Sequence, residues 1–200
     1  MPPSKNNVFP PPDRCGRYLR RLERVYAAMD RSYESAADRY GFACNGCAES
    51  CCRTLFYHHT LVEFLYFSAG FRSLERGLQT ALTARAEAFC RAVQAAGKNG
   101  SSPRHICPVN QADRCRLYAF RPMICRLHGI PSELHRPDGQ TLQAPGCAAF
   151  AESCGHLPQV PFDRTPFYRE LAGIEQDLRR EVAPAGKIKM TVAEMILAVS

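Results

Sequence analysis

At 200 residues the chain is long enough to bury a core without disulfide staples, and its eleven cysteines, an odd number, cannot all pair with one another. The net charge is +7, with 22 arginines and four lysines against 19 acidic residues. Because no long basic run and no interleaving of aromatic and basic residues accompanies this charge, the pattern argues against a nucleic-acid groove and fits a cluster of thiolates that needs counter-charge.

The first twelve residues carry prolines at positions 2, 3, 10, 11 and 12 and predict a disordered lead-in over residues 1–12. This segment has no apolar run of the length of a secretory signal, and no stretch of the chain approaches the roughly 20 apolar residues that span a bilayer. We therefore expect a cytoplasmic protein without a membrane partner. Thiols stay reduced in that compartment, where dense cysteine clusters indicate a metal site or catalysis.

A first helix is predicted over residues 13–40, because apolar residues recur there at steps of three and four. Gly41 ends the pattern, whose members are Cys15, Leu19, Leu22, Tyr26, Met29 and Tyr33. Since Cys15 lies on this apolar stripe, we interpret it as a buried packing residue.

Two more helices are predicted before residue 100. The sequence Thr60-Leu61-Val62-Glu63 has the form of a capping box, hydroxyl first and carboxylate three residues later, and predicts a helix start that Gly70 soon interrupts. From Ser73 to about Ala96 a second apolar stripe predicts the clearest helix of the chain, with Leu74, Leu78, Leu82, Ala86, Phe89 and Val93 on one face. Cys90, next to this stripe, is interpreted as packing.

Residues 101–164 carry eight prolines, which leave little room for long helices. A segment of this length with weak periodicity needs something other than a hydrophobic face to order it. Helical periodicity returns at residues 167–182, and a short last helix is predicted over residues 191–199. No strand-like alternation is found.

The sequence therefore predicts a mainly α fold. We expect one small helical domain over residues 13–200, with a proline-rich, loop-rich half organised around a cysteine metal cluster. The metal framework would span about residues 42–154, between flanking helices at residues 13–40 and 165–199.

Four thiols lie within nine residues, at Cys44, Cys47, Cys51 and Cys52. Two thiolates at CxxC spacing can close on one ion, with Gly46 allowing the tight turn, and the same spacing also serves as a redox pair. Adjacent cysteines diverge along the backbone, which favours two neighbouring metal positions or a cluster with several ligands. The remaining alternative is that Cys51 or Cys52 is a packing residue.

A second group of thiols follows at Cys107, Cys115, Cys125, Cys147 and Cys154. The two groups form half-sites that folding would bring together. His128, three residues after the third of these cysteines, has a spacing that permits a nitrogen ligand; a histidine there can equally support a ligand or lie exposed. The other histidines are weaker candidates: His58, His59, His105, His135 and His156.

Tyr118, Arg121 and Arg126 lie inside the second cysteine group. Guanidinium groups near thiolates offset negative charge and donate hydrogen bonds to sulfur, so we assign these three residues to cofactor binding. The alternative is that the arginines lie on a solvated face. Because Arg121 precedes Pro122, a bend is predicted there, and it would let the cysteines at 115 and 125 face one centre.

The pattern Cys44-x2-Cys47-x3-Cys51-Cys52, then Cys107-Pro108, then Cys115-x-Leu117-Tyr118-x2-Arg121-Pro122-x2-Cys125-Arg126, resembles the YkgJ-type cysteine cluster family, a CxxCxxCC family described as zinc- or iron-chelating. The resemblance covers about residues 42–147, and CxLYxxRPxxCR is its specific part. This chain has three residues between Cys47 and the adjacent cysteines Cys51 and Cys52, where the family usually has two. The resemblance implies no reaction, but it implies zinc, iron or an iron–sulfur cluster held by Cys44, Cys47, Cys51, Cys52, Cys107, Cys115, Cys125 and Cys147.

The leading hypothesis is a metal-binding protein, because soft thiolates select zinc, iron or an iron–sulfur cluster over hard cations. The first alternative is a redox or group-transfer enzyme that uses the cluster, although the chain has neither a glycine-rich phosphate loop nor a known nucleophile motif. The second is an interaction or nucleic-acid module stabilised by zinc.

Overall fold

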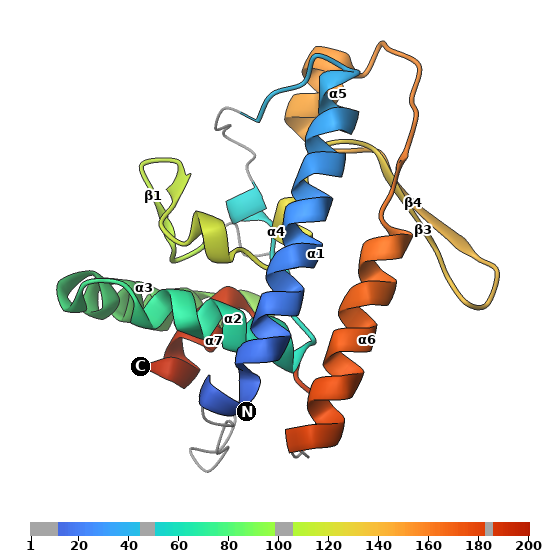
Figure 1. Cartoon of the computed structure of the whole chain (residues 1–200). Coiled ribbons are helices and arrows are strands. Elements are labelled where there is room, and N and C mark those ends of the chain that lie inside the picture. The colour runs from blue at the N-terminus through green and yellow to red at the C-terminus, as the bar shows by residue number, and fades with distance from the viewer. Residues whose placement is uncertain (1–11, 45–50, 99–105, 183–185) are drawn as a thin grey trace.

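The computed structural model describes residues 12–44, 51–98, 106–182 and 186–200, and most of them are helical, as predicted. Figure 1 shows the arrangement of the elements. Their order is α1 (Pro12–Asp38), η1 (Cys51–Arg53), α2 (Leu61–Arg72), α3 (Arg76–Lys98), β1 (Asn110–Gln111), β2 (Arg114–Cys115), η2 (Tyr118–Phe120), α4 (Met123–Arg126), β3 (Ser132–His135), β4 (Thr141–Ala144), α5 (Ala148–Cys154), β5 (Phe162–Asp163), α6 (Thr165–Val182) and α7 (Val192–Val199).

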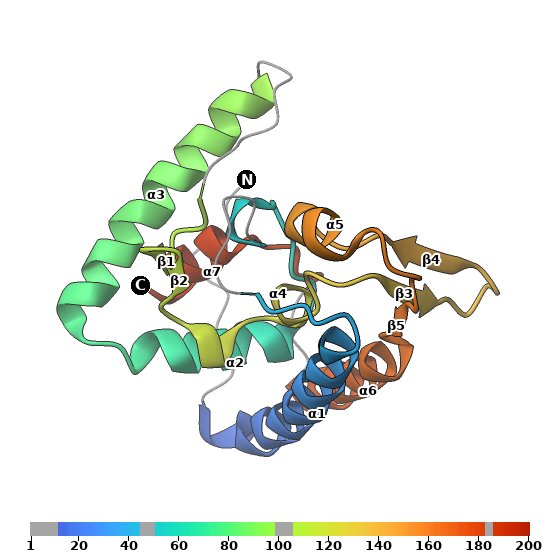
Figure 2. The same cartoon turned by 90° about the horizontal axis from the view of Figure 1, so that it is seen from above.

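The first helix, α1, begins and ends within two residues of its predicted bounds and lies beside α6 (Figures 1 and 2). Its apolar stripe is buried, including Cys15, which is 1% exposed, so the prediction that this thiol packs in the core is confirmed. Charged pairs join the outer edges of the two helices. Arg21 donates to Asp177 at 2.7 Å, and Arg17 pairs with Glu181.

Helix α2 lies at the centre of the molecule, and almost all its residues are buried. It contacts α1, α6, α7 and η2. The prediction that Gly70 interrupts this helix is wrong, because α2 continues through it to Arg72. Gly70 is instead the position where the ring of Phe120 lies against the helix backbone, so a side chain there would collide with the ring.

The start of α2 is also capped differently from the prediction. Thr60 occupies the N-cap but makes no side-chain cap bond, and its hydroxyl donates to Glu63 at 2.6 Å. The carboxylate of Glu175, on α6, accepts the N–H groups of Leu61 and Val62 at 2.8 and 2.9 Å. A side chain from another helix therefore satisfies the first N–H donors of α2.

Helix α3 extends away from the body, and α7 packs between it and α2 (Figure 2). The predicted stripe is present on α3, and Cys90 is half-buried against the core. The capping box of this protein lies at α7. Thr191 Oγ1 accepts the N–H of Glu194 at 3.2 Å, and the Glu194 carboxylate accepts the N–H of Thr191 at 2.7 Å.

Short strands occupy part of the proline-rich half, where no strand was predicted. Strands β1 and β2 form a hairpin whose two loop residues, Ala112 and Asp113, both have positive φ, the geometry of a type I′ turn. Strands β4, β3 and β5 form a small sheet in that order, with β3 antiparallel to β4 and parallel to β5. Strands of two to four residues are too short to give an alternating pattern in sequence.

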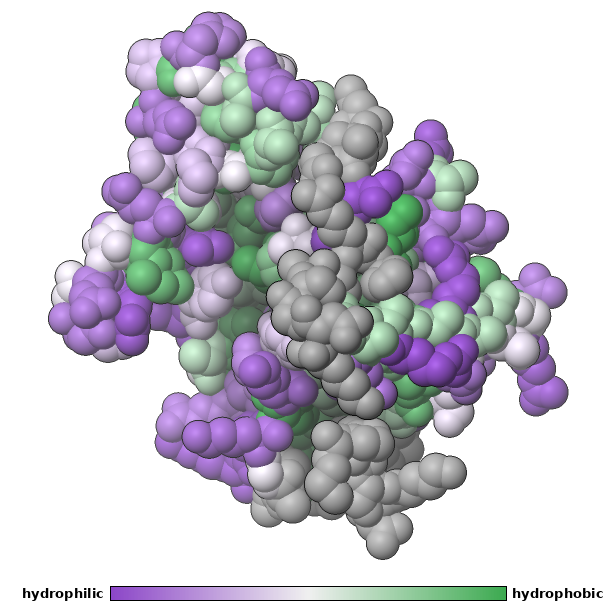
Figure 3. All heavy atoms as spheres, turned by 180° about the vertical axis from the view of Figure 1, so that it is seen from behind, coloured by the Kyte–Doolittle hydropathy of each residue, from purple (hydrophilic) through white to green (hydrophobic). Residues whose placement is uncertain are grey.

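The buried hydrophobic residues form one cluster that joins the helices to the loop-rich half. Seen from behind, the surface is largely hydrophilic, with hydrophobic residues in a central hollow (Figure 3). In the described ranges, no helix combines the length and hydrophobicity that crossing a membrane requires. The predicted lead-in lies outside the described residues, apart from Pro12, where α1 begins.

Candidate metal centre

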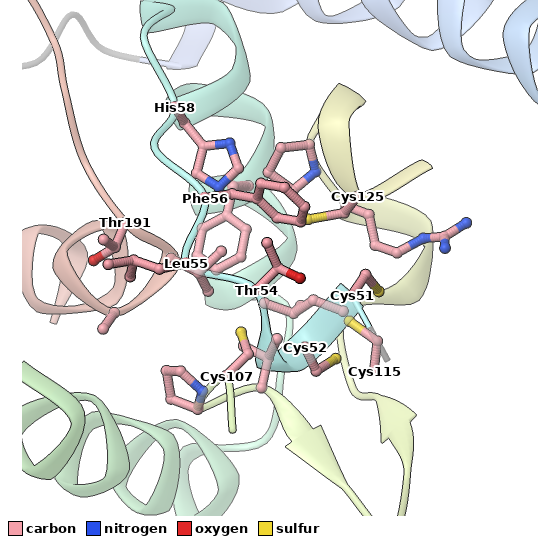
Figure 4. A pocket seen from close by; sticks show the side chains of 18 of the residues that line it. Cys51, Cys52, Thr54, Leu55, Phe56, His58, Cys107, Cys115, Cys125 and Thr191 are labelled. Atoms are coloured by element: carbon pink, nitrogen blue, oxygen red, sulfur yellow. The ribbon is translucent and has the colours of Figure 1, made fainter. Parts of the chain in front are cut away.

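Five cysteines from four segments of the chain line one pocket at the junction of η1, β2, α4 and α7 (Figure 4). The free volume of the pocket is about 50 Å³, enough for only a few water molecules. Apolar side chains form much of its remaining wall, among them Leu55, Phe56, Phe67 and Phe89. The thiols belong to Cys51, Cys52, Cys107, Cys115 and Cys125.

Backbone hydrogen bonds hold the cysteine-bearing segments together. The N–H of Cys107 donates to the carbonyl of Cys52 at 2.7 Å, which joins two segments that are far apart in sequence. The β1–β2 hairpin then returns the chain, with the N–H of Arg116 bonded to the carbonyl of Val109 at 2.8 Å, and so places Cys115 on the same wall. The grouping of the thiols therefore follows from the chain path.

A buried polar network positions the segment that carries Cys125. The guanidinium of Arg126, 5% exposed, donates to Asp30 on α1 at 2.6 Å and to the carbonyl of Arg121 at 2.9 Å, and it also bonds the carbonyl of Ala119. It lies over the ring of Tyr26, 4.2 Å from the ring centroid. Arg126 thus fixes the turn between η2 and α4 against α1.

Burial and mutual repulsion make the pocket thiols resist ionisation. Desolvation raises the pKa of Cys107 to about 12, and it also raises the pKa values of Cys115 and Cys125. The pKa of Cys51 is raised first by a hydrogen bond with the Cys52 thiol and then by burial. The charges of neighbouring thiolates add to each of these increases, so a cation among them would be strongly stabilised.

Arg121 is the charged side chain on the pocket wall, and its charge lowers the pKa values of Cys51, Cys115 and Cys125. Its backbone is extended, with φ −60° and ψ 137°, at the predicted bend before α4. The guanidinium stacks on Tyr118 at 3.6 Å from the ring centroid, and Tyr118 itself is 63% exposed. Of the three residues predicted to bind a cofactor, Arg121 borders the pocket, Tyr118 lies outside it and Arg126 supports it from behind.

Two predicted ligands, Cys44 and Cys147, are not part of the pocket wall. Both raise the pKa of Tyr33, so they lie near its hydroxyl, which donates to the carbonyl of His128 at 2.8 Å. Cys147 is the N-cap of α5, and its sulfur accepts the N–H of Phe150 at 3.4 Å. The remaining predicted ligand, Cys47, lies outside the described residues.

Cys154 and His128 are both packed within the described structure. Cys154 is 4% exposed, and its thiol donates to the carbonyl of Tyr40 at 3.4 Å. The ring of His128 packs edge-on against Phe56, with the centroids 5.7 Å apart. Neither residue lines the thiol pocket.

Sequence reasoning gave little weight to His58, whose side chain is 3% exposed and lines the pocket. Its backbone pairs with Met190, just before α7, so the first residues of α7 also reach the wall. No local pattern predicts a pairing between such distant segments.

Within the described ranges, no three Cys, His, Asp or Glu side chains converge closely enough to hold one ion. The thiols line one wall of the pocket without meeting at a point. A single ion would therefore have to draw several thiols together, whereas a cluster of several atoms could span the distance between them. Comparison of the chain with protein-family models, curated proteins and solved structures finds no match.

Proposed function

We propose that this protein binds zinc or iron through the thiols of the pocket, either as ions or as an iron–sulfur cluster. The observation that carries the proposal is the grouping of five half-buried thiols on one pocket wall, those of Cys51, Cys52, Cys107, Cys115 and Cys125. Thiols are soft donors, and no carboxylate lies among the described residues that line the pocket, so this donor set suits zinc or iron–sulfur chemistry better than a hard cation.

The ionisation behaviour of the thiols supports the same proposal. Their pKa values are raised because burial and neighbouring thiolates oppose ionisation. A bound cation reverses this balance, since it deprotonates coordinating thiols outright. Metal binding would then supply folding free energy to the proline-rich half of the chain, on the order of 10 kcal/mol for a structural zinc site.

We propose a second metal centre for the predicted ligands that do not line the pocket. Cys44 and Cys147 share the neighbourhood of Tyr33 and do not line the pocket. The resemblance to the YkgJ-type family implies that Cys44 and Cys147 are metal ligands. It also implies that Cys47 is a ligand together with them. Family membership itself remains a proposal that rests on the motif.

The test is anaerobic purification followed by measurement of zinc, iron and acid-labile sulfide per chain. We expect a near-integral metal content that falls in Cys107→Ser and Cys125→Ser. The matched control is Cys90→Ser, a half-buried thiol on α3 that does not line the pocket, which should leave the metal content unchanged. Wild-type protein with neither metal nor sulfide at near-integral stoichiometry would refute the proposal.

The same preparation separates the two forms of the centre. A colourless protein with zinc and no sulfide indicates thiolate-bound zinc, whereas a visible absorption band that dithionite bleaches reversibly indicates an iron–sulfur centre. Removal of the metal by a chelator should lower the melting temperature in either case, because the metal binds the folded state.

A further inference from the structure

The end of the pocket opposite most of the thiols is closed by His58 (Figure 4). Its backbone is fixed by two hydrogen bonds with Met190, at 2.7 and 3.0 Å, and its side chain is 3% exposed. Within the described ranges, Nε2 of His58 has no hydrogen-bond partner. Because buried polar side-chain atoms are nearly always paired, this nitrogen has an unmet interaction at the pocket wall.

The first turn of α7 lies beside His58, because Met190 immediately precedes its N-cap. Thr191, Val192 and Ala193 line the same pocket. The capping box satisfies the N–H of Glu194, while the N–H groups of Val192 and Ala193 have no acceptor in the described part of the chain. Free N–H groups at a helix start, together with the helix dipole, favour an anion or another strong acceptor.

The charges around the pocket are mixed, because Arg121 acts on the thiols and the Glu63 carboxylate lies near enough to His58 to act on its pKa. Among the described residues that line the pocket, Arg121 is the one with a charged side chain. The two carboxylates just behind the wall are already engaged. Glu194 accepts from Thr191, and Glu63 accepts from Tyr26 and from the N–H of Met123.

We propose that this end of the pocket binds a small carboxylate, with its oxygens on Nε2–H of His58 and on the free N–H groups at the start of α7. The apolar part of the ligand would lie against Leu55 and Phe56 and face the thiols. A carboxylate fits better than phosphate or sulfate, because oxygens on every side of a tetrahedral anion would meet apolar walls. The whole pocket has a free volume of about 50 Å³, which suits a ligand as small as acetate or propionate.

The inference uses no cysteine as a ligand, although the carboxylate and a metal centre would share one small pocket. A response in metal-free protein therefore tests it independently of metal binding. The experiment is an NMR titration of ¹⁵N-labelled protein, as purified and after metal removal, that follows the imidazole nitrogens with acetate, propionate, acetamide and pivalate. We expect acetate and propionate to shift the His58 signal in a saturable manner. Acetamide, which lacks the charge, and pivalate, which is too large, should not shift it.

The variant His58→Phe assigns the signal and keeps the cavity filled, and His59→Gln is the matched control, since His59 is the exposed neighbour. Acetate should raise the melting temperature of wild type and His59→Gln but not of His58→Phe. The wild-type titration decides the question even if His58→Phe does not fold. A response of His59 equal to that of His58, or no saturable response to either carboxylate, would overturn the proposal.

Discussion

The carboxylate of Glu63 accepts a hydrogen bond from the backbone N–H of Met123, with 2.8 Å between Oε1 and N. The same oxygen accepts from the hydroxyl of Tyr26 at 3.0 Å, and the other oxygen accepts from Thr60 at 2.6 Å. One buried side chain on α2 therefore holds α1 and the first residue of α4, two positions before Cys125.

Replacement of Glu63 with alanine should be strongly destabilising. It leaves the buried Tyr26 hydroxyl and the Met123 N–H without an acceptor, so we expect a loss of about 2–4 kcal/mol in the free energy of unfolding. The measurement is urea denaturation of metal-free protein. Glu63→Gln keeps an acceptor and should lose less, and Glu87→Ala, at an exposed position on α3, should be close to neutral. Equal stability of Glu63→Ala and Glu87→Ala would contradict this role.

The contact between Gly70 and Phe120 gives a second prediction. A methyl group at position 70 would fall inside the Phe120 ring, so Gly70→Ala should destabilise the fold by about 1–3 kcal/mol through overpacking. Gly77→Ala, on α3, is the control, because a methyl group there would meet only the Glu75 carboxylate, at 4.0 Å; it should be neutral or stabilising by less than about 1 kcal/mol. Thermal denaturation of the two variants measures the difference.

A double-mutant cycle with Phe120→Leu identifies the cause of the loss. If the Phe120 ring is responsible, Phe120→Leu should lower the free energy of unfolding less in the Gly70→Ala background than in wild type. Additive effects of the two substitutions would show that the loss at position 70 has another origin.

The helical half of the fold is predictable from sequence because its helices are long and amphipathic. Apolar steps of three and four locate α1, α3 and α6 to within a few residues. The predictions of a capping box at Glu63 and of a helix break at Gly70 were wrong because both residues serve tertiary contacts instead. Glu63 serves the buried network and leaves the helix cap to Glu175, and Gly70 accommodates Phe120.

The candidate site is predictable in part. The cysteine spacing indicates two groups that folding brings together, and Cys51 and Cys52 do share a wall with Cys107, Cys115 and Cys125. That Cys44 and Cys147 do not line this pocket depends on the tertiary path of the chain, which their spacing does not reveal. The burial of His58 depends on its pairing with Met190, which no local pattern reveals.

Arg121 should control the reactivity of the pocket thiols. Its charge lowers the pKa values of Cys51, Cys115 and Cys125, so Arg121→Ala should raise them and reduce the thiolate fraction at pH 8. Because the thiolate is the nucleophile, alkylation of these cysteines by iodoacetamide should slow several-fold. Mass spectrometry of metal-free protein measures each rate. The exposed Arg116, changed to alanine, is the control, and equal rates in the two variants would exclude an electrostatic role for Arg121.

The pH dependence of stability should reflect the buried histidine rings. Burial lowers the pKa of His128 below 6.5, its ordinary value, and the unfolded chain keeps that ordinary value. Between the lowered pKa and 6.5 the unfolded state therefore binds more protons, so stability falls as the pH drops below 6.5 and is unaffected above it. His58 has the same direction of shift for the same reason.

The variant His128→Phe keeps a ring against Phe56 and removes the titrating group. It should weaken the loss of stability between pH 7.5 and pH 5.5 by less than about 1 kcal/mol, because the His128 ring is partly solvated. Urea denaturation of metal-free wild type, His128→Phe and the exposed control His156→Phe at both pH values measures the change. A pH dependence that is identical in all three proteins would show that burial of His128 does not oppose its protonation.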